Sequence, residues 1–164
     1  MLQPLVRRTW APRGETPVMY CWDRHDRLSV IAGLSLAGRR RRIGLYFAAH
    51  VKNVAAQEVE TFVRCVQRQL RRPLIVVMDR AAIHRKAARV LEADPRFCIE
   101  WLPPYAPDLN PVEHVWCHTK YGDLANYIPD DLQGLEFQFE CSMQETRQCP
   151  ELMRSFFHGA ELEL

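Results

Sequence analysis

The hydrophobic positions of the chain follow two different periods, and the alternation between them predicts an α/β fold. Four short runs rich in apolar and β-branched residues have the length and flanking turns of strands. These predicted strands lie at 27–36, 43–49, 73–79 and 96–102. Elsewhere, apolar residues recur in steps of three and four, which predicts amphipathic helices. The first predicted helix has Asn53 as its N-cap, and the second spans 83–93. A third begins near Pro111, and two more span 131–145 and 149–158.

The order of these elements indicates how the strands pair. The first two strands flank "AGRRRR" (37–42), a predicted hairpin turn with Gly38 at the bend, so they should pair antiparallel. The run "PLIVVMD" (73–79) is unbroken and apolar, which is typical of a strand buried on both faces. Helices separate the later strands and allow parallel crossovers between them. We therefore expect an antiparallel hairpin joined to parallel strands.

Composition narrows the class of protein. A chain of 164 residues with 48% hydrophobic residues is long and apolar enough for one folded domain over residues 1–164. The N-terminal residues lack the apolar core of a secretory signal, and the longest strictly apolar run (74–78) is too short to span a membrane. Six cysteines without a CxxC pair are typical of reduced thiols. We expect a cytoplasmic protein that contacts no membrane.

The net charge of +2 conceals a strong asymmetry. Residues 1–122 carry 20 Lys or Arg and 11 Asp or Glu, whereas residues 123–164 carry 2 basic and 9 acidic residues. Of the 22 basic residues, 19 are Arg, whose planar side chain pairs well with phosphate. A nucleic-acid partner for the basic part fits this pattern, although GC-rich coding alone also produces an excess of Arg. The acidic tail from about residue 123 is predicted to form helices that cover the sheet or a partner chain.

Two carboxylates have defined places in this predicted fold. Asp79 follows the strand at 73–79, at the edge where open α/β sheets form their sites. Glu113 falls at the third position of a helix for which Asn110 is a good N-cap and Pro111 fits the first position. The preceding loop, "PPYAP", is preset to extended geometry by its prolines. The stiff connector should therefore fix where Glu113 points.

Each carboxylate also has a purely structural interpretation. A glutamate at the third helical position is a common capping residue, and an aspartate after a strand is a common turn residue. Taken singly, these interpretations are the better ones. Taken together, the two acids at one edge of an α/β sheet indicate a divalent-metal site, because Mg²⁺ prefers carboxylates, water and phosphate oxygens. Similarly, "HVWCH" (114–118) has zinc-ligand residue types, but polar positions on a helix explain them better.

Two segments carry a resemblance to a known family. "VVMDRAAIH" (76–84) followed by "LPPYAPDLNPVEHVW" (102–116) resembles the DDE transposase catalytic domain of bacterial insertion sequences, in the insertion-sequence 630 branch of the Tc/mariner superfamily. The "RTWAPRGETP" loop (8–17) and the hairpin strands are also similar to that family. The similarity runs from about residue 5 to residue 127.

The resemblance implies a fold, a chemistry and a set of residues. It implies a ribonuclease-H-like mixed sheet flanked by helices, which cuts and joins double-stranded DNA at transposon ends with two Mg²⁺ or Mn²⁺ ions. By this match Asp79 is the second catalytic and metal-binding carboxylate, and Glu113 is the third. Arg80 stands where the family usually has Asn. The candidate DNA-binding residues are Arg39, Arg40, Arg41, Arg42, Arg80 and Lys120, although a solvated turn explains the arginines at 39–42 equally well.

The chain departs from the family at its start. The family places its first catalytic Asp on the first strand, shortly before the "RTWAPRG" loop, whereas this chain has no acidic residue before Glu15. We therefore expect an N-terminally incomplete domain that lacks its first strand and does not cut DNA alone. Two alternatives remain open. The chain is a non-catalytic DNA-binding or regulatory remnant that associates with full-length transposase or with itself, or it is another ribonuclease-H-like nuclease in which Asp23 or Asp26 replaces the missing acid.

Overall fold

The fold was taken from a computed structural model, which describes residues 7–18, 20, 28–38 and 42–164. Two antiparallel strands come first, and helices then alternate with two parallel strands before a helical C-terminal part. The elements in chain order are β1 (Ser29–Ala37), β2 (Arg42–His50), α1 (Ala56–Leu70), β3 (Leu74–Met78), α2 (Ala82–Leu91), β4 (Phe97–Trp101), η1 (Pro107–Leu109), α3 (Pro111–His118), η2 (Thr119–Asp123), α4 (Leu132–Gln148) and α5 (Pro150–Gly159). This order matches the succession of strands and helices predicted from the hydrophobic periods.

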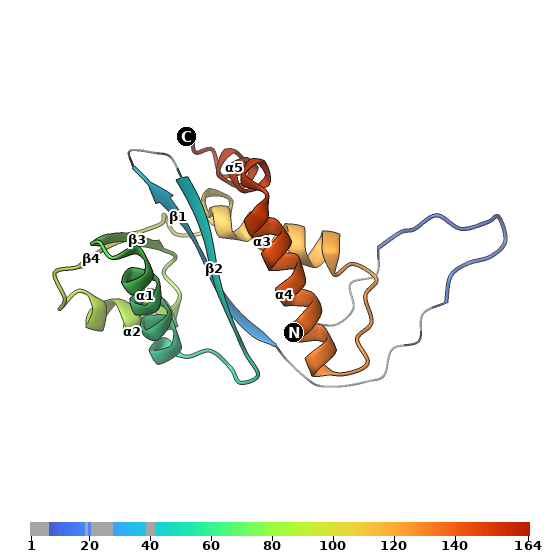
Figure 1. Cartoon of the computed structure of the whole chain (residues 1–164), viewed down its shortest axis with the longest axis horizontal. Helices are drawn as coiled ribbons and strands as arrows, with labels where there is room; N and C mark the ends of the chain where they lie inside the picture. Colours follow the sequence, from blue (N-terminus) through green and yellow to red (C-terminus); the bar gives the residue numbers. More distant parts are fainter. Residues whose placement is uncertain (1–6, 19, 21–27, 39–41) are drawn as a thin grey trace.

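Strands β1 and β2 form the predicted antiparallel hairpin. Ser29 pairs with His50 at the open end, and Ala37 pairs with Arg42 next to the turn. The turn residues 39–41 lie outside the described part of the chain. The hairpin lies between two groups of elements, with α1, α2, β3 and β4 on one side and α3, α4 and α5 on the other (Figure 1).

Helix α1 begins later than the sequence pattern predicted. The expected N-cap at Asn53 is wrong, because Ala55 occupies the N-cap position and the helix starts at Ala56. The physical reason is the Glu58 carboxylate, which accepts a hydrogen bond of 2.9 Å from the Ala55 N–H and so stabilises that start. The helix ends at Leu70, and the C-cap residue Arg71 has a left-handed backbone with φ of 53° and donates its N–H to the Gln67 carbonyl.

Strands β3 and β4 pair in parallel, with Leu74 opposite Phe97 and Met78 opposite Trp101. Helix α2 makes the crossover between them, as predicted. The prediction that residues 73–79 are buried on both faces is wrong, because the side chains of Ile75 and Val77 are 73% and 58% exposed. One face of β3 packs against α1 and α2, but nothing in the described part of the chain covers its other face.

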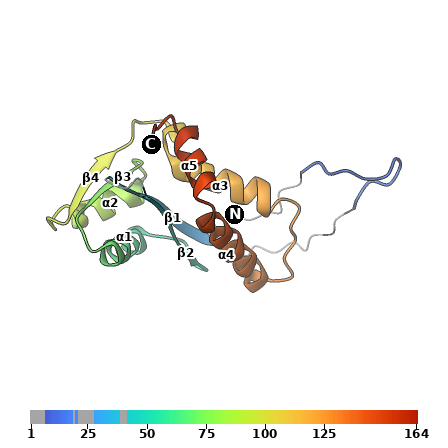
Figure 2. The ribbon, with the colours of Figure 1, turned by 45° about the horizontal axis from the view of Figure 1, so that its top comes forward.

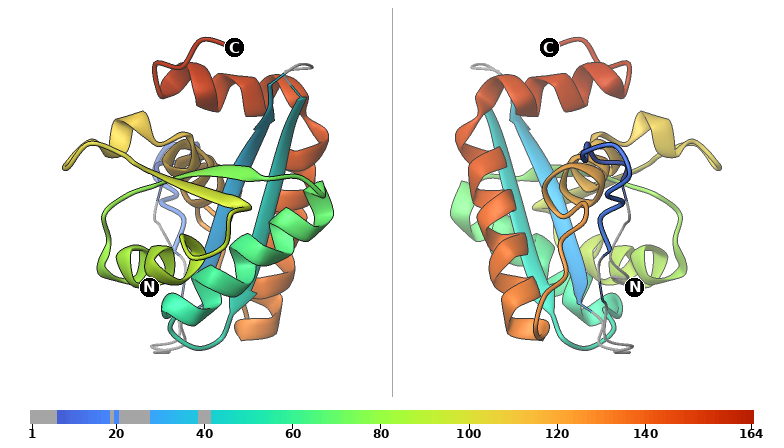
Figure 3. Two further views of the ribbon diagram at one scale, coloured as in Figure 1. Left: turned by 90° about the vertical axis from the view of Figure 1, so that its left-hand side faces the viewer. Right: turned by 90° about the vertical axis from the view of Figure 1, so that its right-hand side faces the viewer.

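The described strands form two separate two-stranded sheets, β1–β2 and β3–β4. The continuous mixed sheet that was expected from the sequence is therefore not confirmed. The two sheets are nevertheless packed together, because Ile31 of β1 contacts the cluster formed by Val59, Met78 and the two alanines of α2. Figure 3 shows α1 crossing one face of the hairpin while α4 lies along the opposite face.

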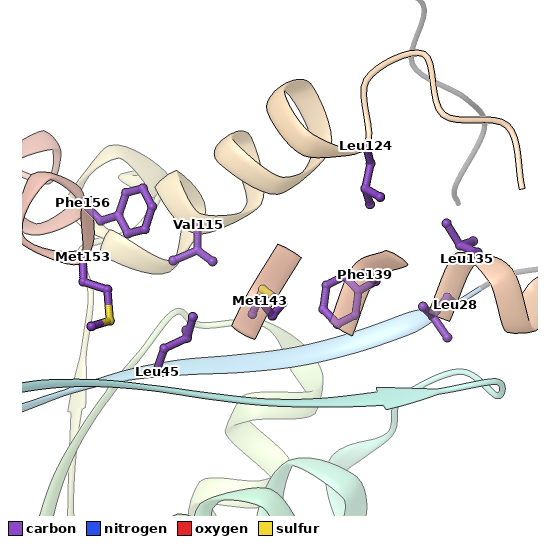
Figure 4. Packing of buried hydrophobic residues seen from close by; sticks show 9 residues of the cluster. All are labelled: Leu28, Leu45, Val115, Leu124, Leu135, Phe139, Met143, Met153 and Phe156. Carbon is purple, nitrogen blue, oxygen red and sulfur yellow. The ribbon is translucent and has the colours of Figure 1, made fainter. Parts of the chain in front are cut away.

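The main hydrophobic core lies between the hairpin and the C-terminal helices. Leu45 of β2 and Val115 of α3 are almost completely buried there, together with Met143 of α4 (Figure 4). Phe47 and Phe139 meet edge to face at 5.8 Å between ring centroids. The acidic C-terminal part thus forms helices that pack on the hairpin, which was one of its two predicted roles. No helix among the described residues is long and apolar enough to cross a bilayer.

The segment 7–18 extends away from the rest of the molecule (Figure 2). Its side chains are exposed, including that of Trp10. Arg7 attaches the segment to the end of the α3–η2 region, because its N–H donates to Asn126 Oδ1 at 2.7 Å and its guanidinium donates to the Tyr121 carbonyl. Gly14, whose φ is +93°, lies in a turn closed by a hydrogen bond of 3.0 Å from the Glu15 N–H to the Pro12 carbonyl.

Candidate active site

Asp79 occupies the position predicted for it, directly after the last residue of β3. Its Oδ1 accepts a hydrogen bond of 2.8 Å from the Ala81 N–H, so the structural role as a turn residue is real. That role uses only one carboxylate oxygen. The side chain is 49% exposed, and within the described residues Oδ2 has no hydrogen-bond partner. Asp79 can therefore shape the turn and still offer an oxygen to a ligand.

His84 is the last residue of the quoted motif "VVMDRAAIH", and no role was predicted for it from the sequence. It lies in the first turn of α2, and its Nδ1 is 2.5 Å from Asp79 Oδ1. A histidine that donates to a carboxylate fixes the orientation of that carboxylate, as outer partners of metal ligands commonly do. The sequence signal for this contact is the spacing of five residues between Asp79 at a strand end and His84 at a helix start, which lets the two side chains meet.

Glu113 also lies where it was predicted, at the third position of α3. Asn110 is the N-cap, and its side chain accepts a hydrogen bond of 3.2 Å from the Val112 N–H. A glutamate at this position usually accepts from the N-cap N–H. Here the Asn110 N–H instead donates to the Pro107 carbonyl at 2.9 Å. The capping interpretation is thus not supported, and the Glu113 carboxylate has no hydrogen-bond partner in the described part of the chain.

Asp79 and Glu113 line the same open cleft, which has a volume of about 430 Å³. The proline-rich loop between β4 and α3 forms its other wall. Tyr105 stands at the rim, fully exposed and with a left-handed backbone of φ 58°, a conformation that non-glycine residues rarely adopt. The remaining lining residues are Arg80, Ala81, Leu102, Pro103, Pro104, Ala106, Pro107 and Asn110.

A third carboxylate does not join these two within the described residues. No group of three or more His, Cys, Asp or Glu side chains there is arranged to hold a metal ion. Asp23 and Asp26, the alternative third acids, lie outside the described residues. Asp79 and Glu113 fit a divalent cation in chemical type, because hard oxygen ligands with room for water and phosphate are what Mg²⁺ prefers.

The predicted DNA-binding residues are distributed over several parts of the fold. Arg80 is exposed and lines the cleft next to Asp79. Lys120 is exposed in η2, at the far end of α3 from Glu113, and Arg42 is exposed at the start of β2. The other three arginines of the hairpin tip, at 39–41, lie outside the described residues. Of the candidates that the structure describes, Arg80 lines the cleft with the two carboxylates, and Arg42 and Lys120 do not.

The histidines of α3 face away from the cleft. The ring of His114 lies against Gly159 of α5, and the ring of His118 lies 5.9 Å from that of Phe156. His118 Nε2 is 3.6 Å from a carboxylate oxygen of Asp123. These contacts support the interpretation of "HVWCH" as part of the packing between helices, and they do not assemble a zinc site among the described residues.

A cleft with two carboxylates, one at the end of a parallel strand and one at a helix start, offers the hard oxygen ligands that divalent cations prefer. The family comparison specifies the class of protein. Residues 1–134 match the model of the family described as DDE superfamily endonuclease, which covers most of the chain. The chain therefore belongs to the DDE superfamily endonucleases, a family that implies a DNA substrate and generally uses divalent metal ions. A search of curated proteins finds no match.

Proposed function

We propose that this chain is a catalytic-domain fragment of an insertion-sequence transposase, acting in the cytoplasm on double-stranded DNA at transposon ends. The observation that carries the proposal is that Asp79 and Glu113 line one cleft. The family match supports the class of reaction, since a DDE endonuclease cleaves phosphodiester bonds. The insertion-sequence 630 branch is supported by the two quoted motifs around these carboxylates.

The chemistry follows from what each residue can do. The Asp79 Oδ2 and the Glu113 carboxylate would hold Mg²⁺ or Mn²⁺ ions, and such ions stabilise the attacking and leaving oxygens of an in-line phosphoryl displacement. His84 would fix the direction of the Asp79 carboxylate through Oδ1. The Pro107–Leu109 turn would keep Glu113 directed at the cleft by occupying the Asn110 N–H. Arg80 would neutralise a phosphate of the bound strand.

We further propose that a strand carrying the third carboxylate completes the site. Such a strand would sit between β1 and β3, and would join the two separate sheets into one ribonuclease-H-like sheet. The support is that β1 pairs only with β2, and β3 only with β4, within the described residues. Because unpaired strand edges promote association, the 164-residue chain should self-associate or bind full-length transposase until this strand is present.

The test is a cleavage assay on transposon-end DNA with Mg²⁺ or Mn²⁺. We expect no strand cleavage by the 164-residue chain, and cleavage by a protein extended upstream to include the first Asp of the family motif. Asp79→Ala and Glu113→Ala in the extended protein should each abolish cutting. Cleavage by the 164-residue chain that is lost on Asp23→Ala or Asp26→Ala would instead identify the alternative nuclease.

The regulatory alternative predicts a different outcome. One observation favours it, namely that no three-acid site is assembled in the described part of the chain. It predicts that the extended protein also fails to cut, while the 164-residue chain binds DNA and alters cutting by an active transposase. Whether the extended protein cuts DNA therefore distinguishes the two proposals.

A further inference from the structure

The solvent face of α2 carries only positive charge. Arg85, Lys86 and Arg89 are exposed, whereas Ala88 and Leu91 on the opposite face are buried against α1 and the β3–β4 pair. At 100° per residue the three basic side chains fall within one arc of the helix surface. Residues 80–91 contain no Asp or Glu, so no acid on the helix offsets these charges.

Among the described residues, the basic side chains on the solvent face of α2 make no ion pairs, unlike other basic residues nearby. Arg64 of α1 is held by Glu60 and Asp94, and Arg96 is held by Asp94. Within the described residues, no carboxylate pairs with Arg85, Lys86 or Arg89. A charged side chain that already forms an ion pair must break or share that pair to bind a phosphate. Arg85, Lys86 and Arg89 have no such pair to break among the described residues.

The basic face leads directly away from the candidate active site. Arg80 lines the cleft beside Asp79, and α2 begins two residues later at Ala82. Helix α2 then runs away from that edge of β3–β4, because it returns the chain to the start of β4 (Figure 2). A phosphate backbone that enters the cleft at Arg80 would therefore continue along Arg85, Lys86 and Arg89.

We propose that the solvent face of α2 binds the phosphate backbone of the duplex DNA that flanks the scissile bond. Arg85 and Arg89 are one turn apart, about 5–6 Å at their Cβ atoms, so their long side chains can reach successive phosphates of one strand. The face reads no bases, because arginine and lysine contacts to phosphate position the duplex without sequence information. The inference rests on the proposed function for its ligand, since that function makes duplex DNA the polymer in the cleft.

The experiment compares two triple variants with the same change of charge. Arg85→Gln/Lys86→Gln/Arg89→Gln removes the basic face of α2. The matched control, Arg68→Gln/Arg71→Gln/Arg72→Gln, removes three exposed arginines from the end of α1 and the residues before β3, which carry the same charge but do not belong to the solvent face of α2. The 164-residue chain and both variants are titrated with a duplex of unrelated sequence at several salt concentrations, and circular dichroism verifies that each variant is folded.

We expect the α2 variant to lower the slope of log affinity against log salt by about 2–3, because each released phosphate contact contributes roughly 0.9. The control variant should leave the slope within about 0.5 of the original. Equal loss in both variants, or no loss in the α2 variant, would overturn the inference in favour of diffuse attraction by total charge. The measurement needs no catalysis, so a chain that binds through α2 but never cuts, even when extended, would disprove the proposed function and retain the inference.

Discussion

Helices α1 and α3 start in similar ways, yet their glutamates differ in role. Glu58 and Glu113 each occupy the third position of a helix. Glu58 accepts a hydrogen bond from the Ala55 N–H and so caps its own helix. Glu113 has no such donor, because the Asn110 N–H is already bound by Pro107 and the Asn110 side chain caps the helix. The position of a glutamate in a helix therefore does not decide its role; the partner of the N-cap N–H does.

The largest expected effect separates the two glutamates by metal binding. Glu113→Gln should weaken Mn²⁺ binding by at least about tenfold, since even partners outside the ligand sphere have effects of that size. Glu58→Gln should leave Mn²⁺ binding unchanged and lower the melting temperature. Titration of Mn²⁺ followed by electron paramagnetic resonance measures the first effect, and circular dichroism measures the second. Equal effects of the two substitutions on Mn²⁺ binding would end the distinction between the two helix starts.

Local sequence chemistry was sufficient to predict the start of α3. Asn110 and Pro111 each have one strongly preferred place at a helix start, so the position of Glu113 followed from them. The same logic failed at α1. Asn53 has the side chain of an N-cap, but the start of the helix is set by Glu58, which accepts a hydrogen bond from the Ala55 N–H. The sequence alone does not show which of the two possible starts, at Asn53 or at Ala55, is adopted.

Features that depend on distant parts of the chain were harder to predict. The apolar residues of β3 gave no indication that Ile75 and Val77 face solvent, because a run of apolar residues does not state what covers it. The gathering of Asp79 and Glu113 in one cleft followed from their places at strand and helix ends, but the contact between Asp79 and His84 was not predicted. Its geometry depends on the angle at which α2 leaves β3.

The next effect concerns the two caps themselves. Asn110→Ala should cost about 1 kcal/mol of folding stability, the usual value for loss of an N-cap side chain. Ala55→Ser should have the opposite sign and a similar size, because Ala55 already has the extended backbone of an N-cap and lacks an accepting side chain. Urea unfolding of both variants measures the difference. Destabilisation by Ala55→Ser would show that Glu58 already fully satisfies the start of α1.

A smaller effect tests the turn that keeps Glu113 from capping. Pro107→Gly should cost roughly 0.4–1 kcal/mol, mainly by loosening the unfolded chain. It should also weaken Mn²⁺ binding, because a looser turn releases the Asn110 N–H to the Glu113 carboxylate. Pro95→Gly is the matched control, since Pro95 is exposed in the turn before β4 and does not line the cleft. If both variants bind Mn²⁺ equally, the turn at Pro107 does not direct Glu113.

The smallest effect is the pH dependence of the cap at α1. The hydrogen bond from the Ala55 N–H lowers the pKa of Glu58 below its ordinary value. A carboxylate with a lowered pKa contributes stability above its unfolded pKa, about 4.3 for Glu, and loses that contribution as the pH falls through its folded pKa. The difference in melting temperature between the native chain and Glu58→Gln should therefore be constant near neutral pH, begin to shrink as the pH falls to about 4.3, and disappear once the pH is below the lowered folded pKa.

Asp94 is a control for the predicted direction of the pH dependence, because its pKa is also lowered. Its pKa is held well below the ordinary value, first by the side-chain hydrogen bond from Arg96 and then by the Arg96 backbone N–H. The destabilisation caused by Asp94→Asn should thus also be present at neutral pH and fade on acidification, but it should persist to lower pH than that of Glu58→Gln because more donors hold the charge. A Glu58→Gln difference that grows as the pH falls would mean that Glu58 is stabilised in its protonated form, and the contrast with Glu113 would then need a different cause.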